Sequence, residues 1–206
     1  MKLNTEPLEA EKIYHIYNRG INGDNIFITR GDGKVFLDNF FSYTENILDT
    51  YCYCLLKNHF HFLVKIKSES EIREKFPYKL DKSISSIISK QFSHFFNSYA
   101  NIFKNKYERT GGLFETPFRR IWVDSDAYFT EMIYYIHSNP QKHGFTGDFR
   151  NHLYSSYHIY ENDLISDKVK VEEVLNWFGG KEEFKRYHEQ RQKDMNIQSK
   201  YIFEVD

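Results

Sequence analysis

The residues with the clearest capacity for chemistry are two histidines that flank one phenylalanine. His59, Phe60 and His61 lie in the run LLKNHFHFLVKI, whose apolar and β-branched residues are typical of a β-strand. Residues i and i+2 of a strand point to the same face of a sheet, so both imidazoles would project side by side. Two neighbouring nitrogen ligands on a rigid strand make half of a site for a divalent metal ion. The simpler interpretation is a pair of polar side chains on a solvent-facing strand.

A tyrosine and an asparagine in the segment YYIHSNP form the second group. Tyr135 and Asn139 are four residues apart and would share one face of a helix. A phenolic hydroxyl is a potential covalent nucleophile, and an amide oxygen is a potential ligand for a hard metal ion. Tyr134 is the competing nucleophile, about 100° away around the helix. The simpler interpretations are a core aromatic residue and an ordinary helix stop before Pro140.

The elements that must position these groups follow from the hydrophobic pattern. Alternating apolar and aromatic residues predict extended segments over residues 12–18, 50–56, 60–66 and 113–123. Helical spacing of apolar residues predicts helices over residues 33–48, 83–104 and from 124 or 125 to about 139. The last helix is expected to stop at Pro140, since proline disfavours helix at the residue before it. Strands and helices in this order favour an α+β fold, a ferredoxin-like antiparallel sheet sandwiched with helices.

The 206 residues suit one large domain with a small appendage. Beyond Asp148 the chain becomes polar and aromatic, and residues 169–190 are typical of one or two short helices around Gly179 and Gly180. We therefore expect a main domain over residues 1–160 and a C-terminal helical extension over 161–206. Aromatic residues make up 18% of the chain, and most of them must be core.

Composition also limits where the protein works. No window approaches 18 consecutive apolar residues, so no transmembrane span and no membrane partner are expected. The start, MKLNTEPLEAEK, has no apolar segment of the kind that a secretory signal needs. Cys52 and Cys54 are two residues apart in an apolar run and cannot form a disulfide framework. The expected location is the cytoplasm.

The charge of the chain is small but unevenly distributed. The formal net charge is −1, which argues against a strongly basic nucleic-acid binder. Residues 86–120, however, carry six basic residues and two acidic ones, whereas residues 161–206 carry eight basic and eleven acidic residues. A basic middle and an acidic tail allow a local anionic partner, although solvated faces give the same pattern.

The two motifs resemble those of the His-hydrophobic-His single-strand nucleases and, more narrowly, those of the REP-associated tyrosine transposases. HFHFLVK is followed about 75 residues later by YIHSNPQKHGF. Three further segments resemble the same family in the same order: YHIYNRGINGDNIF, GGLFETPFRRIWVDSDAYFTEMIYYIHSNP and NHLYSSYHIY. Tyr154 stands in the last segment where Trp is usual. The resemblance covers roughly residues 12–160.

The resemblance implies a reaction and a role for each residue. Members of the family have an antiparallel sheet with helices, and they cleave and join single-stranded DNA next to a hairpin. His59 and His61 match the residues that bind Mg2+ or Mn2+, and Tyr135 matches the nucleophile that forms a 5′-phosphotyrosine. Asn139 falls where related transposases place an amide ligand, often Gln. The implied partner is single-stranded or hairpin DNA, bound at the nucleoid by a monomer or a homodimer.

Basic side chains would supply the contacts to DNA phosphates. The candidates are Arg19, Lys90, Lys104, Arg109, Arg119 and Arg120. Arg19 belongs to the Asn-Arg-Gly turn, where its alternative role is to pair with an acid. His137 and His143 lie close to the tyrosine motif and are expected at the surface rather than as ligands.

Two other functions compete with cleavage and strand transfer. A domesticated relative would recognise hairpin DNA and cleave it little or not at all, which the near-neutral charge favours because affinity for DNA rests on cations. A metallohydrolase that uses water would need a general base near the histidines, and the sequence has no His-Glu-x-x-His or similar signature. The intact His59, His61, Tyr135 and Asn139 favour the transposase reaction.

Overall fold

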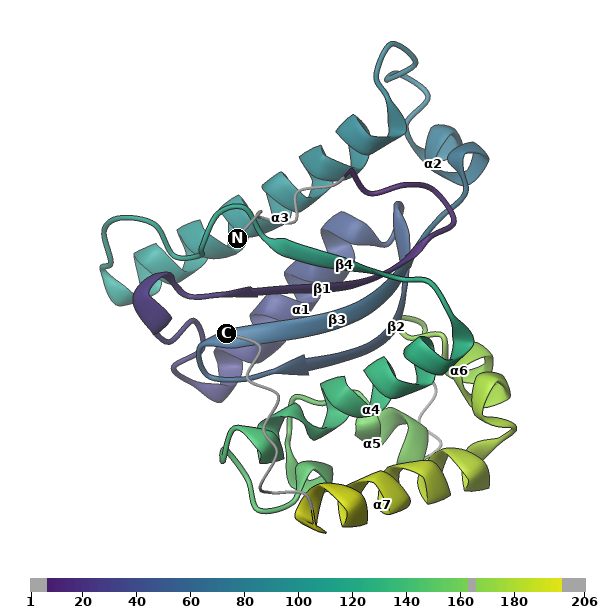
Figure 1. Cartoon of the computed structure of the whole chain (residues 1–206). Helices are drawn as coiled ribbons and strands as arrows, with labels where there is room; N and C mark the ends of the chain where they lie inside the picture. The colour runs from purple at the N-terminus through teal and green to yellow at the C-terminus, as the bar shows by residue number, and fades with distance from the viewer. Residues whose placement is uncertain (1–6, 163–165, 198–206) are drawn as a thin grey trace.

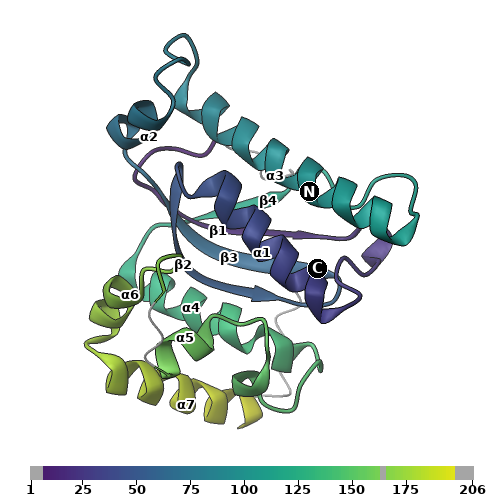
Figure 2. The same ribbon diagram turned by 180° about the vertical axis from the view of Figure 1, so that it is seen from behind.

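The computed structural model describes residues 7–162 and 166–197, which form one antiparallel sheet with helices on both faces (Figure 1, Figure 2). Its four strands are β1 (Ile13–Arg19), β2 (Leu48–Leu55), β3 (His59–Ile66) and β4 (Arg119–Val123). The helices are α1 (Arg30–Thr44), α2 (Glu69–Lys75), α3 (Ile84–Tyr107), α4 (Asp126–Lys142), α5 (Tyr157–Glu161), α6 (Val171–Phe178) and α7 (Lys181–Ile197). Short 3-10 turns lie at Ile21–Gly23 and Phe149–Asn151.

The strands lie side by side in the order β2-β3-β1-β4, and every neighbouring pair is antiparallel. This order, with α1 and α3 as the connecting helices, is the predicted ferredoxin-like α+β arrangement. Strand β1 lies between β3 and β4, and its register sets Tyr17 opposite His61 and Arg19 opposite His59. The polar ends of β1 and β3 therefore meet at one end of the sheet.

Each face of the sheet has its own core, because successive side chains of a strand point to opposite faces. Phe60 and Phe62 pack beneath α1 and α3, where the ring of Phe62 stacks on that of Phe40 with centroids 3.8 Å apart. Leu63 belongs to the opposite core, together with Ile133 of α4. The two cores absorb most of the aromatic residues, as their abundance predicted.

The C-terminal helices cover the side of α4 that faces away from the sheet. Phe184 of α7 is fully buried in the same core as α4. His137 of α4 and His188 of α7 meet with their ring nitrogens 3.0 Å apart, and the other nitrogen of His137 lies 2.9 Å from the hydroxyl of Ser156. Since His188 Nδ1 donates to the carbonyl of Phe184, its Nε2 accepts from His137. This side of α4 is thus held by a chain of neutral imidazoles. The division of the chain near residue 160 stays a prediction.

Several element bounds differ from the sequence expectation. The extended segment predicted over residues 113–123 forms a strand only from Arg119 to Val123. Helix α1 begins at Arg30 and ends at Thr44, and Leu48 is already part of β2. Helix α4 does not stop at Pro140 but runs on to Lys142. Proline removes one backbone donor, yet residues 136–140 are buried, and this packing outweighs the local preference. None of the described helices is long and apolar enough to span a bilayer.

The buried pair His137–His188 predicts a stability that depends on pH. Burial lowers the pKa of His188 to about 4, so the folded protein excludes a proton that the unfolded chain takes up below pH 6.5. We expect the free energy of unfolding in urea to fall between pH 6.5 and pH 4, with about 2–3 kcal/mol arising from His188.

His188→Gln should be less stable than wild type at pH 7.5 but should lose less stability on acidification. His94→Gln, a change at an exposed position of α3, should keep the wild-type slope. Equal slopes for His188→Gln and wild type would contradict this explanation.

Candidate active site

A pocket of about 410 Å³ lies where β1 ends, β3 begins and α4 crosses the sheet. Its walls include His59 and His61 from β3, Tyr135 from α4, and Arg19 from β1. A larger pocket of about 640 Å³ lies elsewhere, between α1 and the chain after α5, and holds none of the predicted site residues. The two motifs found in the sequence therefore converge on one cavity.

The imidazoles of His59 and His61 project from the same face of β3, as their i, i+2 spacing predicted. Their ring centroids lie 5.2 Å apart. Burial lowers the pKa of His59 to about 4 and lowers that of His61 as well, so both rings are neutral at physiological pH. A neutral imidazole offers a nitrogen lone pair to a metal ion.

Asn58 orients the ring of His59. The amide nitrogen of Asn58 donates to the carbonyl of Gly23, which turns its oxygen toward His59 Nδ1 at 2.7 Å. Nδ1 therefore carries the proton and donates to Asn58, and Nε2 keeps its lone pair. The sequence reasoning did not single out Asn58, although its place directly before the His-Phe-His motif was visible.

Asn139 reaches the same point from α4. Its side-chain oxygen lies 3.2 Å from His59 Nε2, so two atoms that both carry lone pairs face each other. Its side-chain nitrogen is buried and, among the described residues, has no hydrogen-bond partner. The Nε2 atom of His61 is buried and unpartnered in the same sense. Buried polar atoms of this kind are uncommon. A bound cation would satisfy a lone pair on His61 Nε2, whereas the N–H groups of Asn139 need an acceptor such as a phosphate oxygen.

The donor set fits a divalent cation. No three His, Cys, Asp or Glu side chains are grouped to hold a metal ion within residues 7–162 and 166–197. The amide oxygen of Asn139, 3.2 Å from His59 Nε2, is the candidate for a third ligand of another type. Two imidazoles and an amide oxygen suit Mg2+ and Mn2+ alike, so the choice between them stays open.

The structure separates the two competing tyrosines. The ring of Tyr135 faces the sheet, with its centroid 5.7 Å from that of His61. Tyr134 points to the opposite side of α4, with its ring centroid 5.6 Å from that of His188. Burial raises the pKa of Tyr135, and the nearby amide of Asn139 partly opposes that rise. The ammonium group of Lys142 lies 4.7 Å from the centre of the Tyr135 ring.

A third histidine, His15, which the sequence reasoning missed, lies next to His61 and lines the same pocket. His15 of β1 is buried, and its Nε2 lies 2.9 Å from Nδ1 of His61. Burial lowers the pKa of His15 to about 3, so it too is neutral. The alternation of KIYHIYN was the available signal, but only the pairing of β1 with β3 brings His15 to His61.

The two remaining histidines near the tyrosine motif differ in their exposure to solvent. His143 is exposed at the rim of the pocket, as expected, with its ring centroid 5.1 Å from that of His59. The expectation of a surface position was wrong for His137, which is fully buried. It lies about 200° around the helix from Tyr135, on the side that α7 covers.

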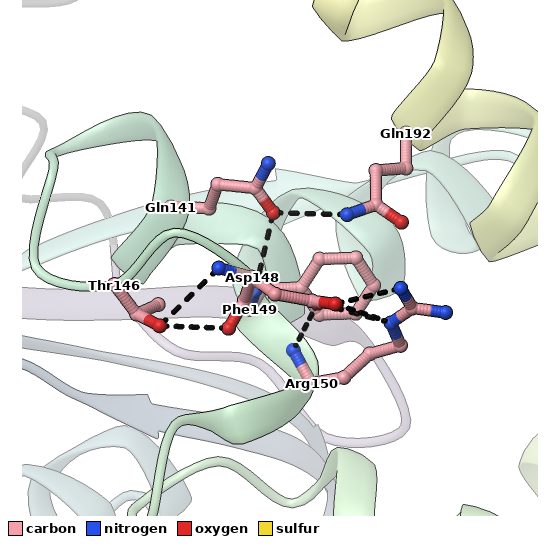
Figure 3. Close-up of polar contacts among 6 residues, drawn as sticks. All are labelled: Gln141, Thr146, Asp148, Phe149, Arg150 and Gln192. Carbon is pink, nitrogen blue, oxygen red and sulfur yellow. Dashed lines mark hydrogen bonds and ion pairs between the residues drawn. The ribbon is translucent and has the colours of Figure 1, made fainter.

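The loop that carries His143 is fastened to α4 and α7 (Figure 3). The side-chain oxygen of Gln141 accepts from the backbone of Phe149 at 3.1 Å and from Gln192 of α7 at 3.2 Å. An ion pair between Asp148 and Arg150, at 2.6 Å, closes the far end of the loop. This wall of the pocket is thus supported by the C-terminal helix.

The six candidate phosphate contacts do not gather in one place. Arg19 and Arg119 line the pocket, and both pair with Glu115. The carboxylate of Glu115 lies 2.6 Å from Nε of Arg19 and 3.7 Å from Nη2 of Arg119. Arg120, the next residue of β4, points to the other face and stacks its guanidinium 4.8 Å from the ring centre of Phe118. Arg109 pairs with Asp24 at 2.7 Å.

Lys90 and Lys104 belong to α3, on the sheet face opposite α4. Of the six candidates, only Arg19 and Arg119 line the pocket.

The architecture is similar to that of a REP-associated tyrosine transposase bound to a REP hairpin, with a TM-score of 0.59 and 12% sequence identity over 82% of this chain and 90% of that chain. Two structures of a bacterial tRNA(His) guanylyltransferase-like protein, with GTP and with ATP, match with TM-scores of 0.42 and 0.43 and identities of 13% and 12%. They cover 72% and 84% of this chain, and 73% and 71% of their own chains. These TM-scores are too low to support an argument.

No family model matches the sequence, and no curated protein matches it. The likeness to the transposase, at 12% identity, therefore concerns the fold. This chain has the fold of a REP-associated tyrosine transposase, as its motifs predicted.

Proposed function

We propose that the protein cleaves and rejoins single-stranded DNA next to hairpins, as a metal-dependent transposase that acts through Tyr135. The observation that carries the proposal is that Tyr135, His59 and His61 line one pocket of about 410 Å³, with the buried amide of Asn139 directly behind His59. A nucleophile, two neutral imidazoles and an amide oxygen are the parts that phosphodiester transfer needs. The fold shared with a transposase that binds a REP hairpin supports hairpin DNA as the substrate.

The reaction follows from the chemistry of the phenol. Tyr135 Oη loses its proton and attacks the scissile phosphorus, a P–O bond to tyrosine forms, and the bond to the 3′ oxygen breaks. The 3′ oxygen leaves with a proton as a free hydroxyl. Phenol has a pKa of about 10, so the tyrosine is also a fair leaving group, and a second 3′ hydroxyl reverses the step without ATP.

His59, His61 and Asn139 would hold Mg2+ or Mn2+ next to a phosphate that entered the pocket. When bound there, a divalent cation withdraws electron density from the phosphate and stabilises the charge on the departing oxygen. Burial raises the pKa of Tyr135, so its phenol needs positive charge nearby to lose its proton. The ammonium group of Lys142, 4.7 Å from the ring centre, supplies part of it.

Arg19 and Arg119 would position the DNA backbone at the pocket. Glu115 pairs with both, so the three side chains together carry one positive charge. A phosphate that binds here exchanges the carboxylate of Glu115 for its own oxygens. A protein that acts on chromosomal hairpins would work in the cytoplasm, at the nucleoid.

A hairpin-binding module with little or no cleavage is the second candidate. It is favoured by the pairing of basic residues with acids, which leaves less positive charge for DNA: Arg109 pairs with Asp24, and Lys106 pairs with Asp32. Binding without cleavage would establish this alternative.

The nucleophile can be tested by covalent trapping on labelled single-stranded DNA with palindromes from the flanks of the gene. With Mn2+, wild type and Tyr134→Phe should form a protein–DNA adduct that survives denaturing electrophoresis. Tyr135→Phe should form none, because it lacks the attacking oxygen. An adduct with Tyr135→Phe would exclude Tyr135 as nucleophile, whereas specific binding with no adduct under any metal would favour the hairpin-binding module.

The metal site can be tested through the electron paramagnetic resonance signal of free Mn2+. His61→Ala and His59→Ala should weaken Mn2+ binding at least about tenfold, because each removes a first ligand, and His143→Ala should leave the affinity unchanged. Since burial lowers the pKa of His59 to about 4, protons do not compete at neutral pH. The affinity should therefore stay level from pH 8 to pH 6. A steep loss near pH 6.5 would show that the ligands are ordinary exposed histidines.

Two adjacent arginines of β4 give a matched test of the DNA path. Arg119→Ala should weaken hairpin binding and reduce the slope of log affinity against log salt by about 1, since Arg119 lines the pocket. Arg120→Ala removes the same charge from the other face and should change binding little. Fluorescence anisotropy at several salt concentrations measures both. If Arg120→Ala weakened hairpin binding more than Arg119→Ala, the DNA would bind on the side of the sheet that α3 covers.

A further inference from the structure

Among the described residues, the ring of His61 makes one hydrogen bond, and its partner is another histidine. Nδ1 of His61 lies 2.9 Å from Nε2 of His15, and both side chains are buried. The rings are stacked, with centroids 5.1 Å apart and planes 19° apart. Nε2 of His61 lies on the other side of its ring, buried and without a partner among the described residues. Nδ1 of His61 is thus hydrogen-bonded to β1, and Nε2 is available to a ligand in the pocket.

The chemistry of two neutral imidazoles makes this contact directional, because one nitrogen must donate and the other must accept. If His15 donates, the proton of His61 sits on Nε2 and blocks that nitrogen as a ligand. If His61 donates from Nδ1, then Nε2 keeps its lone pair. Only the second arrangement leaves His61 able to bind a metal ion.

We propose that His15 is a positioning residue for His61: it accepts the Nδ1 proton and so keeps the Nε2 lone pair of His61 directed into the pocket. This inference rests on the proposed function, in which His61 is a metal ligand. Asn58 serves His59 in the same way, since its oxygen accepts from His59 Nδ1 at 2.7 Å. Each histidine of the His-Phe-His motif then has its own acceptor, one from β1 and one from the turn before β3.

The surroundings of His15 make it a rigid acceptor. It is 4% exposed and occupies the middle of β1, which pairs with β3 on one side and β4 on the other. The ring of Tyr17 stacks on it with centroids 4.8 Å apart, and Tyr135 meets it edge-on with centroids 5.8 Å apart. Because Tyr17 and Tyr135 hold the ring of His15 in place, His15 in turn fixes the orientation of the His61 ring.

The proton positions can be measured directly by long-range 1H–15N correlation spectra of protein labelled with 15N at histidine. The His61 signals are identified by their absence in His61→Ala. Metal-free wild type should carry the His61 proton on Nδ1. A proton on Nε2 would overturn the inference, and this measurement needs no change at His15.

The consequence for the metal is tested with Mn2+ alone, by the loss of the free-ion signal. His15→Phe keeps a stacked ring but removes the acceptor, and it should weaken Mn2+ binding about 10–100-fold. His15→Gln restores an acceptor oxygen and should recover most of the affinity. His94→Phe, at an exposed position of α3, controls for the loss of a histidine and should bind as wild type does. Thermal melts establish that each variant is folded.

The outcomes separate this inference from the proposed function. If His61→Ala abolishes Mn2+ binding while folded His15→Phe binds as tightly as wild type, the role of His15 is overturned and the metal site stands. If wild type binds no Mn2+, the proposed function fails and the role of His15 at a metal site falls with it. If His15→Gln binds Mn2+ as weakly as His15→Phe although both variants are folded, a hydrogen-bond acceptor at this position does not determine the affinity and the inference fails.

Discussion

The imidazole of His59 and the amide of Asn139 meet 3.2 Å apart, although 80 residues separate them in the chain. This contact exists because α4 lies against the face of the sheet from which His59 and His61 project. Ile133 and Ile136 hold α4 there, fully buried in the core that it shares with the sheet. The stripe of α4 that bears Tyr135 and Asn139 thereby closes over β3, so apolar burial creates the proposed active site.

The cost of this arrangement is visible in the buried polar groups. His61 Nε2 and Asn139 Nδ2 lack partners among the described residues, and burial keeps His15, His59 and His61 neutral. A protein selected only for stability would satisfy or replace such groups. Their position in or directly behind one pocket that a tyrosine also lines is consistent with a site whose partners arrive with the cation and the DNA.

Sequence periodicity predicted the strands, the main helices and the shared face of His59 and His61, because these depend on contacts within one element. It could not choose between Tyr134 and Tyr135, since both belong to the same helix and the choice depends on which side α7 covers. The expected surface position of His137 was wrong for the same reason, because α7 covers that side of the helix. Pro140 shows the reverse case, in which buried packing overrides a reliable local stop signal.

The sequence by itself determined the element order, the ferredoxin-like class and the motifs, because local spacing and alternation encode them. The tertiary structure alone decided which residues meet. His15 acquires a role only when β1 pairs with β3, and Arg119 and Arg120 separate only because β4 joins the sheet with one face toward α4. Such contacts depend on strand register and helix packing, which arise when distant segments bury their apolar surfaces together, and no local pattern records them.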